Sequence, residues 1–454
     1  MKINTRTAFT ILLGCIAFSS FAQEKKWTLE ECVHYAMEKN ISIRQSELDL
    51  KLSEIDKKDA FGSYLPTANL SGSHSWNIGL TPGISGILEQ QTTQFTNVGV
   101  STGVDIYKGL QNQKQYRRQK IAIVASKYKL LKMQEDVSIN VANAFLQVLF
   151  NKENLKVQQQ QLEIDLKQAE RTEQLVEGGA VPRGDLLDIE ATVAADRQRV
   201  IQSENELLIS KLSLAQLLQL DEFWNFDIAD EDYSTEESGV MLMKPLEIYD
   251  KAKQLRTEIK IAQANLELAE QDVKIARSAY QPTLRGFYSL NTQITYADYS
   301  TLENGQLVVK APPPFHEQFW DNKAHSFGFQ LNVPILNGFT ARNNVERAKV
   351  ALDRSRLDFD QQRLDLERNV YTAYTDAQGA LKAYDAAVSA ADAREESLNY
   401  ARERYEVGLI NVFDLNQAQT LSVNAQSEVL RAKYDYLFKV KILEFYFGIP
   451  IVQN

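Results

Sequence analysis

The chain has 454 residues, of which 44% are hydrophobic and 24% charged, and its formal net charge is −10 at pH 7. This length and composition fit a globular protein of two or three domains and exclude a disordered or low-complexity chain. The acidic balance argues against nucleic acid as a partner, because a phosphate backbone is bound mainly through lysine and arginine.

Residues 1–22 predict a secretory signal peptide. Two basic residues precede an apolar run that is too short to span a membrane, and small residues lead up to a cleavage site after Ala22. Lipidation at Cys15, within the stretch LLGC, is the alternative. Cleavage after Ala22 leaves Cys32 as the single cysteine, so no intrachain disulfide is expected in this exported protein.

The rest of the chain is an internal two-fold repeat. AFGSYLPTANLSG matches ARSAYQPTLRGFY 216 residues later, and VGVSTGVDIYKG matches FGFQLNVPILNG 229 residues later. The second copy has therefore gained 13 residues between Pro282 and Phe327, as expected for a loop. We expect repeat 1 at residues 23–220, an acidic linker or equatorial segment at 221–244, and repeat 2 at 245–454.

Each repeat contains a predicted β-hairpin, at residues 66–107 and 282–336. In NVGVSTGVDI and SFGFQLNVPI, apolar residues alternate with small or polar ones at a period of two. A proline precedes each hairpin and a glycine follows it. The same alternation fits a soluble sheet with one face on a core, but the sequence offers no other strands for a second layer.

Long helices account for everything else. Leu110–Glu177 lacks both proline and glycine and would extend about 100 Å as a continuous helix. Heptads from Val345 to Ala380 are accompanied by a second series that starts at Val350, about 140° around the helix. Two separate seams imply a neighbour on each side and hence a closed wall, although a broad buried face in a bundle is the alternative. Four strands cannot close a membrane barrel, so oligomerisation is expected: two chains supply eight strands and three supply twelve.

These features together resemble the TolC family of outer-membrane efflux proteins, the outer membrane factors of tripartite pumps. The resemblance rests on YLP and YQP, DIYKG and PILNG, GGAVPRGDLL and VGLINVFDLN, and TLEECVHYAMEKN. It implies a mainly α fold with a small β part. A long coiled-coil α-helical barrel would continue into a transmembrane β-barrel, with four strands per chain and twelve in a homotrimer.

The resemblance also implies a function. The protein would be a passive exit duct of a tripartite efflux or type I secretion system, surrounded by outer-membrane lipid in a Gram-negative bacterium, with a long periplasmic extension. Its partners would be a periplasmic membrane-fusion adaptor and an inner-membrane pump of the RND, ABC or MFS type. The pump type and the exported drug, metal ion or protein stay open. The alternative is a non-porin periplasmic or secreted coiled-coil scaffold or adhesin.

Two short stretches, EGGAVPRGDLL and EVGLINVFDLN, interrupt long helices in the same way, with an aspartate six residues after a glycine. The glycine gives the backbone freedom to turn, and the aspartate falls on the first turn of the next helix, where the helix dipole favours an anion. Plain helix N-capping by Asp185 or Asp414 is the alternative.

By resemblance, these turns are the periplasmic tip, where an adaptor docks and three copies of Asp414 form a ring around the aperture. Ile410 and Gln417 stand where the family often has an arginine and a second carboxylate, so any closed-state lock must differ. The residues implied at the aperture are Asp414, Gln417, Asp185, Tyr405 and Arg404, and those at the docking tip are Gly179, Ala180, Val181, Gly408, Leu409 and Ile410.

No enzymatic chemistry is indicated. The four histidines are scattered without metal-ligand spacing, and the glycines of GGAVPRG follow a helix rather than a strand, so they do not form a phosphate loop. We therefore expect neither a catalytic site nor a bound metal or cofactor.

Overall fold

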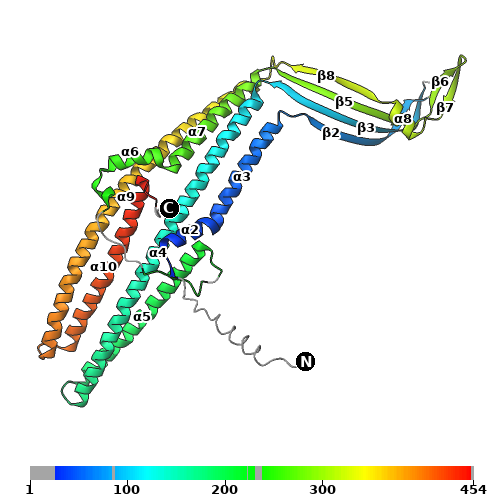
Figure 1. Cartoon of the computed structure of the whole chain (residues 1–454). Helices are drawn as coiled ribbons and strands as arrows, with labels where there is room; N and C mark the ends of the chain where they lie inside the picture. The colour runs from blue at the N-terminus through cyan, green and yellow to red at the C-terminus, as the bar shows by residue number, and fades with distance from the viewer. Residues whose placement is uncertain (1–25, 84–86, 222, 231–237, 451–454) are drawn as a thin grey trace, which may run out of the picture. The chain divides into compact units, whose positions relative to one another are not determined.

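The structure, a computed structural model, describes residues 26–83, 87–221, 223–230 and 238–450, so the predicted signal peptide and Cys15 lie outside the described residues (Figure 1). The helices are α2 (Leu29–Lys39), α3 (Ile41–Gly62), α4 (Gln111–Glu177), α5 (Arg183–Leu218), α6 (Pro245–Leu255), α7 (Thr257–Ala276), α8 (Phe315–Asp321), α9 (Thr340–Glu406) and α10 (Val412–Phe447), with short 3-10 turns η1 (Gly239–Leu242) and η2 (Arg277–Tyr280). The strands are β1 (Lys26–Trp27), β2 (Thr67–Pro82), β3 (Leu88–Lys108), β4 (Asp227–Ile228), β5 (Thr283–Thr295), β6 (Tyr299–Glu303), β7 (Gln306–Lys310) and β8 (Ala324–Asn332).

The chain divides into two compact units that cut across the repeats. The helical unit comprises Met1–Leu48, Tyr128–Lys260 and Asp360–Asn454, and the sheet unit comprises Asp49–Lys127 and Ile261–Phe359. Each unit therefore takes segments from both repeats. The repeats are not separate domains in the packing sense, because neither buries a core of its own.

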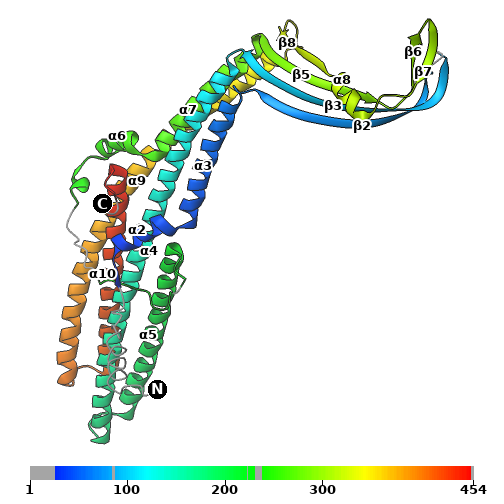
Figure 2. The same ribbon diagram turned by 45° about the vertical axis from the view of Figure 1, so that its right-hand side comes forward.

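The helices show the duplication in their lengths. Helices α4 and α9 each have 67 residues, and α5 and α10 each have 36. The uninterrupted helix predicted up to Glu177 is confirmed. Figures 1 and 2 show α4 paired with α5 and α9 paired with α10 as antiparallel hairpins. In the helical unit, Phe145 and Leu149 of α4 pack with Cys32 of α2 and Leu218 of α5, and all four are essentially inaccessible to solvent.

The sheet has four antiparallel strands in the order β2-β3-β5-β8. The two predicted hairpins are β2–β3 and β5–β8, and the pairing of β3 with β5 joins the repeats. The register aligns Leu70, Val100 and Leu290 across one face, and the next row, Asn69, Ser101 and Ser289, across the other. The sequence alternation thus becomes one apolar face and one polar face.

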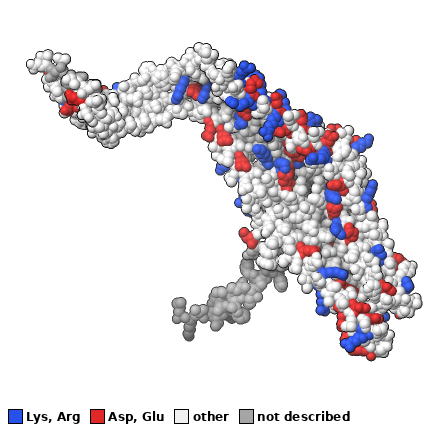
Figure 3. All heavy atoms as spheres, turned by 180° about the vertical axis from the view of Figure 1, so that it is seen from behind, with Lys and Arg blue, Asp and Glu red and all other residues white. Residues whose placement is uncertain are grey.

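The apolar face of the sheet lies open in the single chain. Leu70 is 76% exposed, Phe327 79% and Phe329 76%, which is unusual for large hydrophobic side chains on a regular sheet. On the face drawn in Figure 3, Lys, Arg, Asp and Glu are sparse over the sheet and dense over the helices. A soluble sheet packed on a second layer, the alternative weighed above, would not leave this face uncovered.

The 13-residue insertion is not a bare loop. It folds as the β6–β7 hairpin and α8, so the expectation that the chain has no other strands was wrong. Strand β8 pairs with β5 only as far as Asn291, and α8 covers the rest of that edge. The side-chain amide of Gln318 accepts from Thr295 N at 3.0 Å and donates to Thr295 O at 2.9 Å, as a neighbouring strand would.

The second hairpin ends earlier than predicted. Strand β8 stops at Asn332, so Val333 and Ile335 lie beyond it although they continue the alternation. Pro334 has no N–H to donate to a ladder, which is sufficient reason for the strand to end here.

Candidate functional site

The two long helices α4 and α9 end in the same way. Gly179 has φ +73° and Gly408 has φ +76°, the left-handed region that glycine enters without steric cost. Ala180 N donates to Leu175 O at 2.8 Å, and Leu409 N donates to Arg404 O at 2.8 Å. Each glycine N–H also bonds three residues back, completing a Schellman motif at each helix end. The reason given from sequence for the paired glycines is confirmed.

The returning helices begin differently from each other. Asn411 is the N-cap of α10, and its side-chain oxygen accepts from Asp414 N at 2.8 Å. Pro182 is the N-cap of α5 and makes no side-chain cap bond. Asp185 and Asp414 both lie in the first turn, as predicted. The alternative that either aspartate is itself the N-cap was wrong, since each is the third helical residue.

The two turns lie at the same end of the helical unit, as both views show (Figures 1 and 2). Arg171 and Glu406 form an ion pair between α4 and α9 at 3.6 Å, and Asn416 of α10 donates to Thr192 of α5 at 3.3 Å. Exposed at the tip are Gly179, Ala180, Gly408, Leu409, Arg404, Asp414 and Gln417, while Val181, Ile410, Asp185 and Tyr405 are half-buried.

Large apolar side chains are exposed around the turns. Val407, Leu409 and Phe413 of the second turn and Leu187 of the first all present their side chains to solvent. The hydroxyl of Tyr405 is buried without a hydrogen-bond partner among the described residues. The tip is therefore an apolar surface with a carboxylate at its centre of sequence symmetry rather than a charged one.

Asn411 gives a direct test of this geometry. Replacing it by alanine removes the acceptor for Asp414 N and should lower the local stability of the α10 start by about 1 kcal/mol. Asp185→Asn removes only a favourable dipole interaction and should cost a few tenths of a kcal/mol, about the lower end of that effect. Amide hydrogen exchange at residues 412–415 measures the difference. Unchanged protection in Asn411→Ala would contradict the cap.

A buried pair of carboxylates lies farther along the hairpins. Asp165 of α4 is 1% exposed and Asp196 of α5 is 2% exposed. Gln161 and Gln419 donate to the two oxygens of Asp165 at 2.7 and 2.6 Å, and Arg199 donates to Asp196 at 2.7 Å. Through Gln419, which belongs to α10, the pair links the two helical hairpins. Burial, then the hydrogen bond to Asp196 and its charge, raise the pKa of Asp165 to about 7.

Sequence reasoning missed this pair, although a signal was present. Asp165 follows Leu162 by three residues and Asp196 follows Val193 by three, so both fall on the heptad stripes that were predicted to be buried. A charged residue on a buried stripe indicates a partner from a neighbouring helix.

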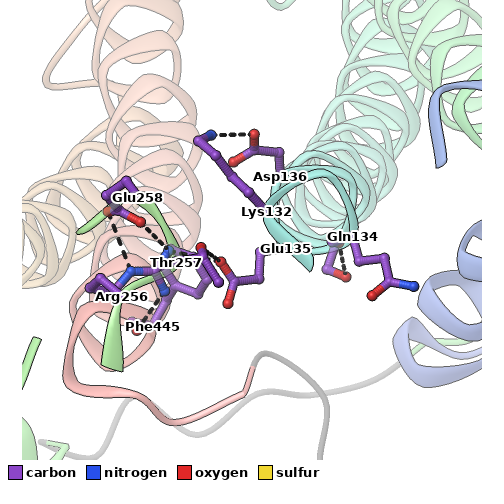
Figure 4. Close-up of polar contacts among 9 residues, drawn as sticks. Lys132, Gln134, Glu135, Asp136, Arg256, Thr257, Glu258 and Phe445 are labelled. Atoms are coloured by element: carbon purple, nitrogen blue, oxygen red, sulfur yellow. Dashed lines mark hydrogen bonds and ion pairs between the residues drawn. The ribbon is translucent and has the colours of Figure 1, made fainter. Parts of the chain in front are cut away.

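Another polar cluster holds the start of α7 against α4 and α10 (Figure 4). Arg256 is buried, stacks on the Phe445 ring at 3.6 Å and donates to Glu135 Oε2 at 3.0 Å and Glu258 Oε2 at 3.3 Å. Thr257 donates to the same Glu135 oxygen at 2.6 Å. A pocket of about 280 Å³ adjoins Arg256 and Phe445, but the guanidinium is already occupied by these partners. The cluster therefore serves packing at a helix junction.

No metal centre is found. Among the described residues, no group of three or more His, Cys, Asp or Glu side chains is arranged to hold an ion. Within the same residues, none of the helices combines the length and apolar character needed to cross a membrane.

The fold combines duplicated long-helix hairpins with a four-stranded sheet whose exposed face is apolar, which defines the class of membrane-associated helical hairpin proteins. The sequence profile described as outer membrane efflux protein matches residues 33–219 and 248–448. The chain therefore belongs to the outer membrane efflux protein family, and its location is the outer membrane of a Gram-negative bacterium.

Individual relatives agree with the family. The chain is 24% identical over 315 residues to outer membrane protein TolC of Vibrio cholerae serotype O1, covering 68% of this chain and 66% of that protein. It is 22% identical over 311 residues to outer membrane protein TolC of Escherichia coli K12, covering 67% and 59%. The alignments thus span slightly less than two thirds of these relatives.

Solved structures share the fold over nearly the whole chain. CusC, described in terms of transmembrane channel formation, has a TM-score of 0.76 at 15% identity and covers 92% of both chains. The outer membrane protein VceC of Vibrio cholerae has a TM-score of 0.72 at 15% identity, with 92% and 96% covered. The Campylobacter jejuni CmeC outer membrane channel has a TM-score of 0.72 at 18% identity, with 93% and 86% covered.

Proposed function

We propose that three copies of the chain form a passive exit duct through the outer membrane, and that the duct serves as the outer component of a tripartite efflux or type I secretion system. The single observation that carries this proposal is the open four-stranded sheet with an exposed apolar face. Strands β2 and β8 stand at its edges, and backbone groups at such edges must find partners in a membrane. Twelve strands from three copies close the sheet around a lumen wide enough to conduct.

The helices support the same assembly. Val350, Leu357 and Leu364 of α9, the second seam predicted from the heptads, are more than three-fifths exposed in the single chain. A neighbouring copy would cover this seam and continue the helical wall. A coiled-coil scaffold or adhesin would bury such a seam as well, but it would leave the apolar face of the sheet in water.

The tip supports partner docking. Its exposed apolar residues, among them Leu409 and Phe413, fit a periplasmic membrane-fusion adaptor that seats on the turns. An inner-membrane pump of the RND, ABC or MFS type would supply the energy, so the duct itself needs neither a catalytic group nor a cofactor. Substrates could include drugs, metal ions or proteins, and the pump selects among them.

Asp414 is the aperture residue of this proposal. Its side chain is exposed and makes no hydrogen bond or ion pair within the described part of the chain. Three such carboxylates at a narrow tip would bind polyvalent cations. Tyr405, Arg404 and Gln417 would shape the closed tip in place of an arginine at position 410. Asp185, half-buried on the other hairpin, would contribute less.

Single-channel recording in planar bilayers tests the proposal. Wild-type protein should conduct and be blocked by hexamminecobalt added on the periplasmic side, and Asp414→Asn should raise the blocking concentration roughly tenfold, because three charges are lost at one site. Asp185→Asn is the matched control and should keep the wild-type block. Equal block in wild type and Asp414→Asn would remove Asp414 from the aperture, and absence of any channel would defeat the duct.

A further inference from the structure

The polar face of the sheet holds a recess of about 220 Å³ near the ends of the strands that adjoin the helices. All four strands contribute to it: its walls include Thr67, Asn69, Ser101, Gly103, Arg285 and Gln330. Hydroxyl, amide and guanidinium groups therefore surround one space, and arginine is the only charged residue among those that line it.

Gly103 makes room for the arginine. A Cβ atom added at Gly103 would lie 2.7 Å from Arg285 Nη2 and 3.0 Å from Nε, closer than real side chains approach. The guanidinium thus lies across β3 rather than extending away from the sheet. The glycine here is required by close approach, since its φ is ordinary, and any larger residue would displace the arginine.

The charge of Arg285 is not neutralised within the chain. Its cross-strand partner in the register is Asp105, but the Asp105 carboxylate accepts from Lys108 Nζ at 3.1 Å. No acceptor for the Arg285 guanidinium is found in the described parts of the chain. Gln330, the register partner on β8, is uncharged. Arg285 is therefore a cation with its hydrogen-bonding fork free, beside hydroxyl and amide groups that can add further donors.

We propose that Arg285 is an anion-binding, selectivity-determining residue inside the duct, an inference that rests on the proposed trimer. Closure of the sheet with its apolar face toward lipid turns the polar face inward, so three guanidinium groups form a ring. Such a ring favours carboxylate, phosphate or sulfate groups, which a planar guanidinium binds through two parallel hydrogen bonds. Anionic solutes, or anionic groups on larger cargo, would be held briefly at this level on their way out.

Block by inorganic pyrophosphate tests the inference. In planar bilayers, pyrophosphate added on the extracellular side should reduce the current of the wild-type channel. Arg285→Gln should raise the half-blocking concentration by roughly tenfold, because the charge-assisted bonds are lost. Arg285→Lys keeps the charge without the fork and should fall between the two. Gly103→Ala keeps the arginine but displaces it, and should also weaken the block.

The outcomes are distinct. Equal pyrophosphate block in wild type and Arg285→Gln, with the same open-channel conductance, overturns the anion site and leaves the duct intact. A wild-type protein that forms no channel at all overturns the proposed function and the inference with it. Block by hexamminecobalt from the periplasmic side should be unchanged in Arg285→Gln, which separates this ring from the carboxylates at the tip.

Discussion

Arginine in place of Val100 is expected to destabilise the assembled protein by about 2–4 kcal/mol, the cost of a basic side chain on the lipid face near the middle of a bilayer. Val100 is exposed in the single chain and is aligned with Leu70 and Leu290 across the sheet. If this face meets lipid, the charge has no counter-ion and little water. Val104→Arg, on the same face of β3, should behave alike.

The control is an arginine on the opposite face of the same strand. Asn97 is exposed on the polar face, three residues before Val100, and Asn97→Arg should cost little because that side meets water in the lumen. Ser101 also lies on the polar face but lines the recess with Arg285, where a second arginine would add repulsion. Folding of the purified variants into lipid vesicles, followed by urea titration, measures the difference. Equal effects at positions 97 and 100 would show that the sheet does not span the membrane in this orientation.

The sequence contained most of the fold because its signals are periodic. A period of two set the faces of β3 and β8, and a run without proline or glycine set α4 to within one residue at its start. The β6–β7 hairpin escaped prediction because it is short and lies in an insertion without a counterpart in repeat 1. The division into two units also escaped, because it depends on packing between repeats rather than on patterns within one.

The tip was predicted in part. The glycines at 179 and 408 could be interpreted because left-handed backbone has few other solutions, whereas the choice between aspartate and Asn411 as cap depends on one backbone position. The free charge of Arg285 could not be predicted. It depends on the register between β3 and β5, which includes an irregularity between Asp105 and Tyr107, and on Lys108 reaching Asp105.

The buried pair Asp165 and Asp196 should make stability fall as pH rises through neutrality. The pKa of Asp165 is raised to about 7 in the folded protein, whereas an aspartate in an unfolded chain has a pKa of about 3.9. The folded state therefore binds a proton more tightly than the unfolded state. The stability that this proton contributes is fully present below about pH 4 and is lost as pH rises through about 7. The loss between pH 4 and pH 8 should be on the order of 2–4 kcal/mol.

Every group that faces the pair is accounted for in this expectation. Gln161 and Gln419 donate to Asp165 and favour its ionised form, but neither carries charge. Arg199 is the cation at the site and it binds Asp196, so the carboxylate of Asp165 has no positive partner. Above pH 7 two negative charges would share a buried space between α4 and α5, and the contact with α10 through Gln419 would be strained.

Asp165→Asn tests the assignment because it keeps the size of the side chain and removes the titration. Its apparent Tm should change little between pH 5 and pH 8, while that of the wild type should fall, so the variant should be the more stable protein at pH 8 by about 1–3 kcal/mol. Circular dichroism at 222 nm on protein in detergent follows the unfolding. Asp414→Asn, an exposed carboxylate on α10, is the matched control and should retain the wild-type dependence on pH. If Asp165→Asn and wild type lose stability in parallel from pH 5 to pH 8, the shared proton is not at this pair, and the pH response must come from other groups.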